Sequence, residues 1–236
     1  MKWAVIIVFL FALREVNAQG KGVWTQKADF GGSNRKGAVG FSIGSKGYIG
    51  TGCEDSILCK DFWEYDTLLN SWTQKADFGG TPRTKAVGFS IGTKGYIGTG
   101  GDSTVACVTK DFWEWDQTTN TWTRKADFGG LPRLLAIGFS VRSKGYIGTG
   151  MDSSGFSKDF WEYDSKSNTW SRKADLPGVS RYAAAGFSIG TKGYIGTGLC
   201  LASPYYLRDF WEWDQISNTW KIFVLPKTTN QNSIYL

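Results

Sequence analysis

The chain has 236 residues, with 31 glycines, 12 tryptophans, 5 prolines, no histidine and a formal net charge of +6. This composition favours short strands joined by tight turns and argues against disorder. Without histidine, Ser-His-Asp and Cys-His catalytic arrangements are excluded. Many of the lysines recur at fixed places in a repeat instead of gathering on one face, which argues against a nucleic-acid partner.

Residues 1–18 have the pattern of a secretory signal peptide. Lys2 precedes an apolar run over residues 4–13, and Val-Asn-Ala at 16–18 fits cleavage before Gln19. We therefore expect a secreted, periplasmic or cell-surface protein, with no membrane insertion after cleavage. An uncleaved membrane anchor is the alternative, because charged residues stand close to the cleavage site.

The rest of the chain repeats a unit of about 49 residues four times. Each unit reads, with small changes, Ala-Val-Gly-Phe-Ser-Ile-Gly, then Lys-Gly-Tyr-Ile-Gly-Thr-Gly, then Asp-Phe-Trp-Glu-Tyr-Asp. A fixed period of this size predicts supersecondary units that bury their apolar faces against one another. Five tryptophans at steps of 48, 50, 48 and 50 residues mark the unit edges: Trp24, Trp72, Trp122, Trp170 and Trp220.

One unit contains four predicted strands. In the second unit, residues 85–91 alternate small and large side chains, and strands follow at 94–99, 111–116 and 121–125. Neither face of the first strand is polar, so both faces should be covered. Four antiparallel strands with two apolar faces are typical of one blade of a β-propeller.

We therefore predict an all-β propeller over 19–226, followed by a polar tail at 227–236. The blades should span about 37–75, 85–125, 134–173 and 182–224, with an extra outer strand at 23–27. This surplus strand allows three interpretations. The chain is a piece of a larger ring, an open arc that self-associates, or four closed blades with one strand left over; we favour an incomplete arc.

The glycine-rich second strand, the Asp-Phe-Trp-Glu-Tyr-Asp strand and the later Asn-x-Trp resemble kelch repeats over about 23–224. The units are also similar to kelch-like repeats of exported bacterial proteins, some labelled galactose-oxidase-like. The resemblance implies a partner site on the face that carries the inter-strand and inter-blade loops. It implies no copper centre, because the copper ligands of galactose oxidase include histidine. The sialidase Ser-x-Asp-x-Gly-x-Thr-Trp box is also absent.

Repeated charged residues should be structural. The arginines start each innermost strand, and we expect them to pair with a repeated glutamate and lock adjacent blades. The alternative is a ring of guanidinium groups that binds carboxylate or phosphate. The residues are Arg35, Arg83, Arg133 and Arg181, and Glu64, Glu114, Glu162 and Glu212.

A ligand site should break the repeat, because few ligands have fourfold symmetry. Exposed aromatic side chains there could stack on sugars or anchor a protein. The alternative is loop variation with local packing only. The candidates are Lys36, Thr84, Leu134 and Tyr182 after the arginines, and Glu54, Phe156, Tyr205 and Tyr206 in the long loops.

The four cysteines indicate at most a disulfide within one loop. Cys53 and Cys59 lie in one loop, so a disulfide between them is plausible in an exported protein, with free thiols as the alternative. The sequence has neither histidine nor Cys-x-x-Cys, which argues against a zinc site. No loop has the closely spaced Asp and Asn residues of a strong calcium site. We expect no metal and no cofactor.

These patterns predict an exported, non-catalytic module that binds a protein or a glycan, and that self-associates if the ring is open. One alternative is a carbohydrate-active hydrolase or lyase that uses two carboxylates. The other is a structural segment of a larger surface protein. The fold alone does not choose among them.

Overall fold

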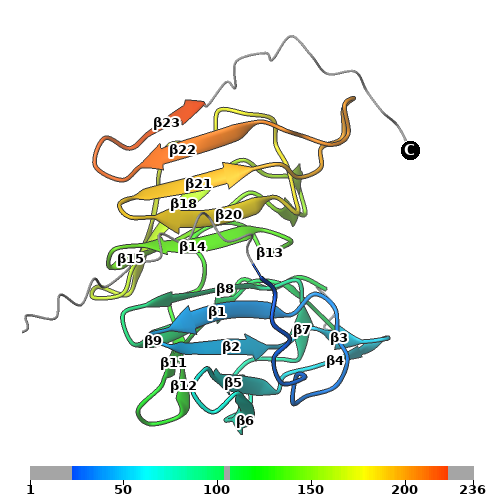
Figure 1. Cartoon of the computed structure of the whole chain (residues 1–236). Coiled ribbons are helices and arrows are strands. Elements are labelled where there is room, and N and C mark those ends of the chain that lie inside the picture. The colour runs from blue at the N-terminus through cyan, green and yellow to red at the C-terminus, as the bar shows by residue number, and fades with distance from the viewer. Residues whose placement is uncertain (1–22, 104–106, 223–236) are drawn as a thin grey trace, which may run out of the picture.

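The computed structural model describes residues 23–103 and 107–222, which contain strands but no helix. Four antiparallel sheets of four strands follow one another along the chain (Figure 1), which confirms the predicted propeller blades.

The first blade holds β1 (Val39–Ile43), β2 (Lys46–Gly50), β5 (Phe62–Asp66) and β6 (Ser71–Lys75). The second holds β8 (Val87–Ile91), β9 (Lys94–Gly98), β11 (Phe112–Asp116) and β12 (Thr121–Lys125). The third holds β14 (Ile137–Val141), β15 (Lys144–Gly148), β18 (Phe160–Asp164) and β19 (Thr169–Arg172), and the fourth holds β20 (Ala185–Ile189), β21 (Lys192–Gly196), β22 (Phe210–Asp214) and β23 (Thr219–Ile222).

Each blade has one face of large side chains and one face of small ones. Successive residues of a strand point to opposite faces, so alternation along the inner strand produces this asymmetry. The large face of one blade packs on the small face of the next. A Cβ atom added to Gly95, Gly145 or Gly193 would lie only 2.6, 2.3 or 2.4 Å from the phenylalanine ring of the preceding blade. The rings need glycine at these places.

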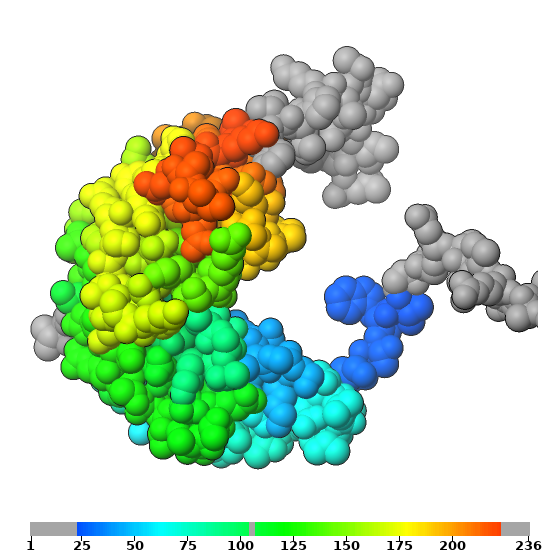
Figure 2. All heavy atoms as spheres, turned by 90° about the vertical axis from the view of Figure 1, so that its left-hand side faces the viewer, coloured from blue at the N-terminus to red at the C-terminus, as the bar shows by residue number. Residues whose placement is uncertain are grey.

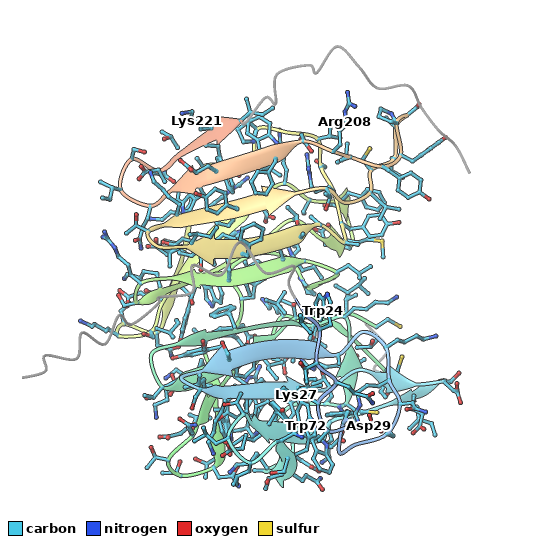
Figure 3. All side chains as sticks on the ribbon, viewed as in Figure 1. Trp24, Lys27, Asp29, Trp72, Arg208 and Lys221 are labelled. Atoms are coloured by element: carbon cyan, nitrogen blue, oxygen red, sulfur yellow. The ribbon has the colours of Figure 1, made fainter. Side chains whose placement is uncertain are left out.

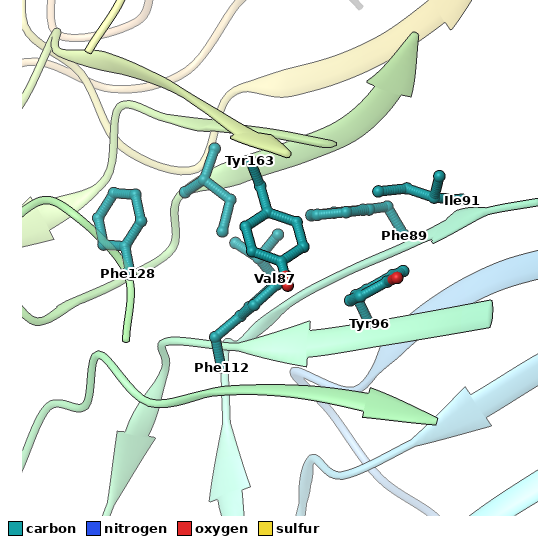
Figure 4. Close-up of a cluster of buried hydrophobic side chains, with 8 residues drawn as sticks. Val87, Phe89, Ile91, Tyr96, Phe112, Phe128 and Tyr163 are labelled. Atoms are coloured by element: carbon teal, nitrogen blue, oxygen red, sulfur yellow. The ribbon is translucent and has the colours of Figure 1, made fainter. Parts of the chain in front are cut away.

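The hydrophobic core consists of three clusters, one between each pair of successive blades. Between the second and third blades, Phe89 and Phe112 of the second meet Tyr163 of the third (Figure 4). The Phe112 and Tyr163 ring centroids lie 4.8 Å apart in an edge-on arrangement, which is a favourable geometry for aromatic pairs. The repeated sequence therefore builds the same interface three times.

The blades form an arc with an open side (Figure 2). β1 packs against β8, β8 against β14, and β14 against β20. The fourth blade leaves its large face uncovered, since Phe187 is 42% exposed while the equivalent Phe89 and Phe139 are 3% and 4% exposed.

The predicted extra strand at 23–27 is wrong, because these residues adopt no strand. Val23 and Trp24 are 88% and 99% exposed, and no neighbouring strand in the described part of the chain pairs with them. The predicted signal peptide and polar tail lie outside the described residues. Within residues 23–103 and 107–222, no helix is long and apolar enough to cross a membrane.

The predicted Cys53–Cys59 disulfide is not formed, and neither cysteine of this loop takes part in a disulfide. A short hairpin of β3 (Cys53–Glu54) and β4 (Ile57–Leu58) pairs Cys53 with Leu58. Cys59 is therefore one residue beyond the position opposite Cys53, and adjacent residues of an extended chain point to opposite sides. Cys53 is buried, whereas Cys59 is half-buried near the Ile57 carbonyl.

Two hydrogen bonds connect each blade to the segment that enters it. An asparagine in the turn before the outer strand accepts a hydrogen bond from a backbone N–H of the entering segment. The outer-strand tryptophan donates its indole N–H to the carbonyl of the same entering residue. In the third blade, Asn168 accepts from Ala126 N–H at 2.9 Å, and Trp170 donates to the Ala126 carbonyl at 3.1 Å. Asn70, Asn120 and Asn218 repeat this arrangement.

We expect Asn168→Ala to lower the free energy of unfolding by about 1–3 kcal/mol. The change leaves the Ala126 N–H and the Tyr163 hydroxyl without their acceptor, and it places alanine at φ +54°. Asn168→Asp is the matched control, because it keeps an acceptor and tolerates this backbone conformation. Equal losses for the two variants in denaturant titrations would contradict the assigned role.

Candidate functional site

The long loops meet at one edge of the arc, which we call the loop face (right-hand edge in Figure 1). It is built on short strands beyond the blades. Besides β3 and β4, these are β7 (Arg83–Thr84) paired with β10 (Gly101–Asp102), and a sheet of β13 (Arg133–Leu134), β16 (Met151–Asp152) and β17 (Gly155–Phe156). The loop face therefore has a hydrogen-bonded backbone.

The residue after each arginine occupies an equivalent place on the loop face. Thr84 pairs with Gly101 and Leu134 pairs with Met151 in short antiparallel ladders. Isolated bridges join Lys36 to Cys53 and Tyr182 to Leu199. The repeat thus fixes the backbone here and leaves the side chain free to vary, which is how Lys, Thr, Leu and Tyr come to stand at equivalent positions.

Aromatic candidates come together where the third blade meets the fourth. The Phe156 and Tyr182 ring centroids lie 4.5 Å apart. A further bridge pairs Leu199 with Tyr206, so the Tyr182 and Tyr206 backbones flank one residue. Tyr205 and Tyr206 are 61% and 75% exposed. We call Phe156, Tyr182, Tyr205 and Tyr206 the aromatic patch.

Other candidates do not join this patch. Lys36 and Glu54 belong to the first blade, at the opposite end of the arc, and Thr84 lies beside Lys36, with its hydroxyl 3.5 Å from the Lys36 carbonyl. Leu134 belongs to the short sheet that contains Phe156. Sequence reasoning missed Leu199, which bridges the patch, and Leu201, which is 76% exposed nearby. Their departure from the repeat was the available signal.

The arginines pair with aspartates, so the predicted glutamate partners are wrong. Arg83 donates to both carboxylate oxygens of Asp111 at 2.6 and 2.8 Å, and to the Thr99 carbonyl at 3.0 Å. The aspartate precedes the third strand of the blade and lies at the loop face beside the arginine. The same pairs are Arg35–Asp61, Arg133–Asp159 and Arg181–Asp209.

The glutamates lie farther along the same strands and have other partners. Glu64 stands opposite Tyr48 in the register of β5 on β2, which takes it away from the arginine. It accepts hydrogen bonds from the Tyr48 hydroxyl at 2.7 Å and from Lys46 at 2.6 Å. Glu114, Glu162 and Glu212 likewise accept from the tyrosine of the neighbouring strand.

The arginine–aspartate pairs leave little capacity for an anionic ligand. Arg83, Arg133 and Arg181 are fully buried, and their guanidinium groups already donate to a carboxylate and to backbone carbonyls. Arg83 also stacks over Phe78, with its guanidinium carbon 4.8 Å from the ring centroid. These contacts indicate that each arginine holds two segments of the chain together, as a structural lock, and that the four arginines do not form a site for anions.

Burial raises the pKa of Asp111, but hydrogen bonds from Arg83 and the arginine charge outweigh it. The net pKa of Asp111 lies below its ordinary value, and the pKa values of Asp61 and Asp209 are lowered for the same reasons. A carboxyl with a lowered pKa is ionised at neutral pH and is a poor general acid. These aspartates therefore suit a structural role.

Asp152, in the short sheet that contains Phe156, is also engaged. Asp152 accepts hydrogen bonds from the Ser154 and Ser157 hydroxyls and lies 3.5 Å from the Arg133 guanidinium. Among residues 23–103 and 107–222, no group of three or more Cys, Asp or Glu is placed to hold a metal ion.

The comparisons with known proteins identify the fold only. No family model matches the chain, and no curated protein matches it. Among solved structures the chain is similar to that of YjhT, a kelch-like β-propeller, with a TM-score of 0.69 and 20% sequence identity. The match covers 83% of this chain and 67% of the YjhT chain. The likeness supports the propeller architecture, while the kelch identity of the repeat stays a prediction.

We expect Arg133→Met to lower the free energy of unfolding by about 3–5 kcal/mol, because it leaves Asp159 without its cationic partner. Arg172→Met is the matched control. Arg172 is exposed and pairs with Asp175 three residues away, so its loss should cost at most about 1 kcal/mol. Similar losses for both variants in denaturant titrations would contradict the assignment of a lock.

Stability should fall in acid because of these aspartates. A group whose pKa is lowered on folding contributes stability above its unfolded pKa of about 4, and this stability is lost as the pH falls through the folded pKa. We expect the free energy of unfolding to decline below about pH 4, and Asp111→Asn to weaken this dependence. Asp127→Asn, at an exposed pair with Arg124, makes the same substitution at a surface carboxyl for comparison. An identical pH profile for Asp111→Asn would refute the assignment.

Proposed function

We propose that the chain is an exported, non-catalytic binding module, and that its loop face contacts a protein or a glycan through the aromatic patch. The observation that carries the proposal is the gathering of repeat-breaking aromatic residues at one place. Phe156, Tyr182 and Tyr206 come from two blades, while the repeated residues around them maintain the frame.

The patch has the properties of a recognition surface. Tyr205 and Tyr206 present large rings to solvent from a backbone that bridges fix to the blade. A tyrosine contributes a large contact area and a hydroxyl while losing few rotatable bonds on binding, and this favours both sugar stacking and protein anchoring. A rigid frame with variable loops is a common design for binding.

The non-catalytic part of the proposal rests on how the acids are used. The chain has no histidine, and the loop-face aspartates neutralise buried arginines or cap local turns. A glycosidase needs two carboxyl groups facing a substrate, one of them held as an acid. Export rests on residues 1–18, whose sequence has the signal-peptide pattern.

Tyr206→Ala should weaken partner binding by about tenfold or more, since exposed aromatic anchors commonly contribute 1–2 kcal/mol or more. A glycan array tests for a glycan partner. A photo-reactive amino acid placed at position 206 tests for a protein partner, because it cross-links the chain to proteins on the cells that produce it. Trp24→Ala is the control, because Trp24 is an aromatic residue that is 99% exposed and does not belong to the aromatic patch.

Unchanged binding by Tyr206→Ala, or equal losses in both variants, would remove the aromatic patch from the proposal. Turnover of a bound glycan would overturn the non-catalytic assignment. A chain that gives neither an array signal nor a cross-linked product would contradict the binding function as a whole.

A further inference from the structure

We propose that the open side of the arc is a docking site for two further blades of the same repeat, carried by a second polypeptide. The small face of one partner blade packs on the fourth blade, and the large face of the other packs on the first blade. The chain and its partner then form a closed ring of six blades, within the range of four to eight that propellers commonly adopt.

The fourth blade has an uncovered apolar face. Ile189 is 64% exposed, whereas Ile43, Ile91 and Val141 at the equivalent positions are 5%, 8% and 1% exposed. Phe187 shows the same contrast. In the first three blades the next blade covers these side chains, so the fourth blade lacks only the neighbour that the others have.

The first blade has the matching small face. A Cβ atom on Gly47 would meet nothing closer than 3.8 Å, whereas Gly95, Gly145 and Gly193 are blocked by a phenylalanine ring. The place above Gly47 is thus open for a ring. A partner built from the same repeat presents a glycine to Phe187 at one end and a phenylalanine to Gly47 at the other, so it fits both faces.

Backbone hydrogen bonds give an independent argument. Each pair of successive blades shares four such bonds, one donated by the earlier blade and three donated by the later one. A blade of this repeat therefore brings a fixed set of donors and acceptors to each side. Between the first and second blades the bonds run from Gly52 N–H to the Arg83 carbonyl at 2.8 Å, from Lys85 N–H to the Gly37 carbonyl at 2.7 Å, from Phe78 N–H to the Lys60 carbonyl at 2.7 Å, and from Arg83 N–H to the Cys59 carbonyl at 3.2 Å.

The two ends of the arc hold the separate halves of two further sets. In the described part of the chain, one donor and three acceptors of the fourth blade have no backbone partner: the Gly198 N–H and the carbonyls of Ala183, Leu207 and Arg208. On the first blade, one acceptor and three donors have no backbone partner among the described residues: the Arg35 carbonyl and the N–H groups of Gly37, Arg35 and Phe30. These groups lie at opposite ends of the arc, with Arg208 on the last blade and Asp29 beside the first (Figures 2 and 3). A partner of the same repeat carries the complement of each set.

The size of the open side limits the partner to fewer than four blades. The four blades of the chain wrap well past a half-circle (Figure 2), so a second copy of this chain is too large for the opening. The match to YjhT covers 67% of that chain, and with four blades in the matched two thirds the remaining third corresponds to two. The 236 residues contain four units, so the two partner blades lie outside them.

Residues 23–27 indicate which strands the partner supplies. Their sequence, Val-Trp-Thr-Gln-Lys, matches Ser-Trp-Thr-Gln-Lys of the outer strand β6. Each outer strand that another blade follows leads directly into the entering segment of that blade. Residues 23–27 lead in the same way into residues 28–35, which Asn70 and Trp72 hold on the first blade at Ala28.

Residues 23–27 are thus the outer strand of the blade that precedes the first one in the ring. They adopt no strand in the single chain because their neighbour, the third strand of that blade, belongs to the partner. Figure 2 shows this segment in dark blue at the open side of the arc. The partner therefore supplies seven strands, which are two blades of four less one outer strand.

The test uses the full chain and a probe made from its own sequence, residues 76–168. The probe contains the second and third blades without the outer strand β19, so it has seven strands. Coexpressed with the full chain, it should copurify. Light scattering coupled to size-exclusion chromatography should then give the mass of one chain plus one probe.

Variants of the full chain show whether the probe lies in the opening. Ile189→Lys places a charge on the large face, and Gly47→Leu fills the place of the incoming ring. Each should lower the amount of recovered complex about tenfold or more. Ile216→Lys, at an isoleucine that is 81% exposed in a turn, is the matched control and should leave the recovery unchanged.

Trp24→Ala tests the role of residues 23–27. It should lower the recovery with the probe 76–168, whose last blade needs an outer strand from the chain. It should have no effect with a longer probe, residues 76–172, which brings its own outer strand β19. Equal losses with the two probes would remove residues 23–27 from the proposed ring.

A single polypeptide keeps the test decisive where the separate probe does not fold. In it, a copy of residues 76–168 replaces residues 224–236 of the full chain. Gly47→Leu should lower the denaturant midpoint of this extended chain, because a phenylalanine ring then lies over position 47. In the original chain the same substitution should not lower the midpoint, since the added side chain enters open space.

Three results would overturn the proposal. The first is a complex that Ile189→Lys and Gly47→Leu leave intact, because the probe would then bind elsewhere. The second is the absence of a complex together with equal effects of Gly47→Leu in the original and extended chains. The third is a 1:1 complex with residues 126–168 alone that both face variants abolish, since one blade would then fill the opening.

Discussion

The structure depends on one contact, in which a phenylalanine ring of one blade packs on a glycine of the next. The ring of Phe89 occupies the space that a side chain at position 145 would need, and the same holds for Phe41 over Gly95 and Phe139 over Gly193. Close packing gives this contact its value, because interiors leave little room for an added atom or a void. The arginine–aspartate pairs and the asparagine turns then hold the entering segment of each blade against its own sheet.

Sequence reasoning could predict this architecture because the period and the alternation of large and small residues reflect packing directly. It predicted four blades, each of four antiparallel strands. It failed where the outcome depended on register. Arg83 pairs with Asp111 and not with Glu114, because Glu114 lies beside Tyr96 once β11 pairs with β9. The Cys53–Cys59 disulfide failed for a similar reason, since hairpin pairing places Leu58 opposite Cys53. Residues 23–27 have the composition of an outer strand, but a strand also needs a neighbour.

The fold was predicted from residues that recur in every unit, whereas the candidate site was predicted from residues that differ between units. The repeated bridges fix the backbone after each arginine, and the side chain at that place then differs from blade to blade. The sequence indicated Phe156, Tyr182 and Tyr206 as departures from the repeat. Only the structure brought them together, since their proximity depends on how the third and fourth blades stack. Composition gave no measure of that distance.

A double-mutant cycle between Phe89 and Gly145 tests the central contact most directly. In the unchanged chain, Gly145→Ala should cost about 1–3 kcal/mol, because the added methyl group overlaps the Phe89 ring. In a chain that carries Phe89→Ala, the same substitution should cost much less, since the ring is gone. Equal costs in both backgrounds would contradict the account, because they would show that blade stacking does not seat the ring on this glycine.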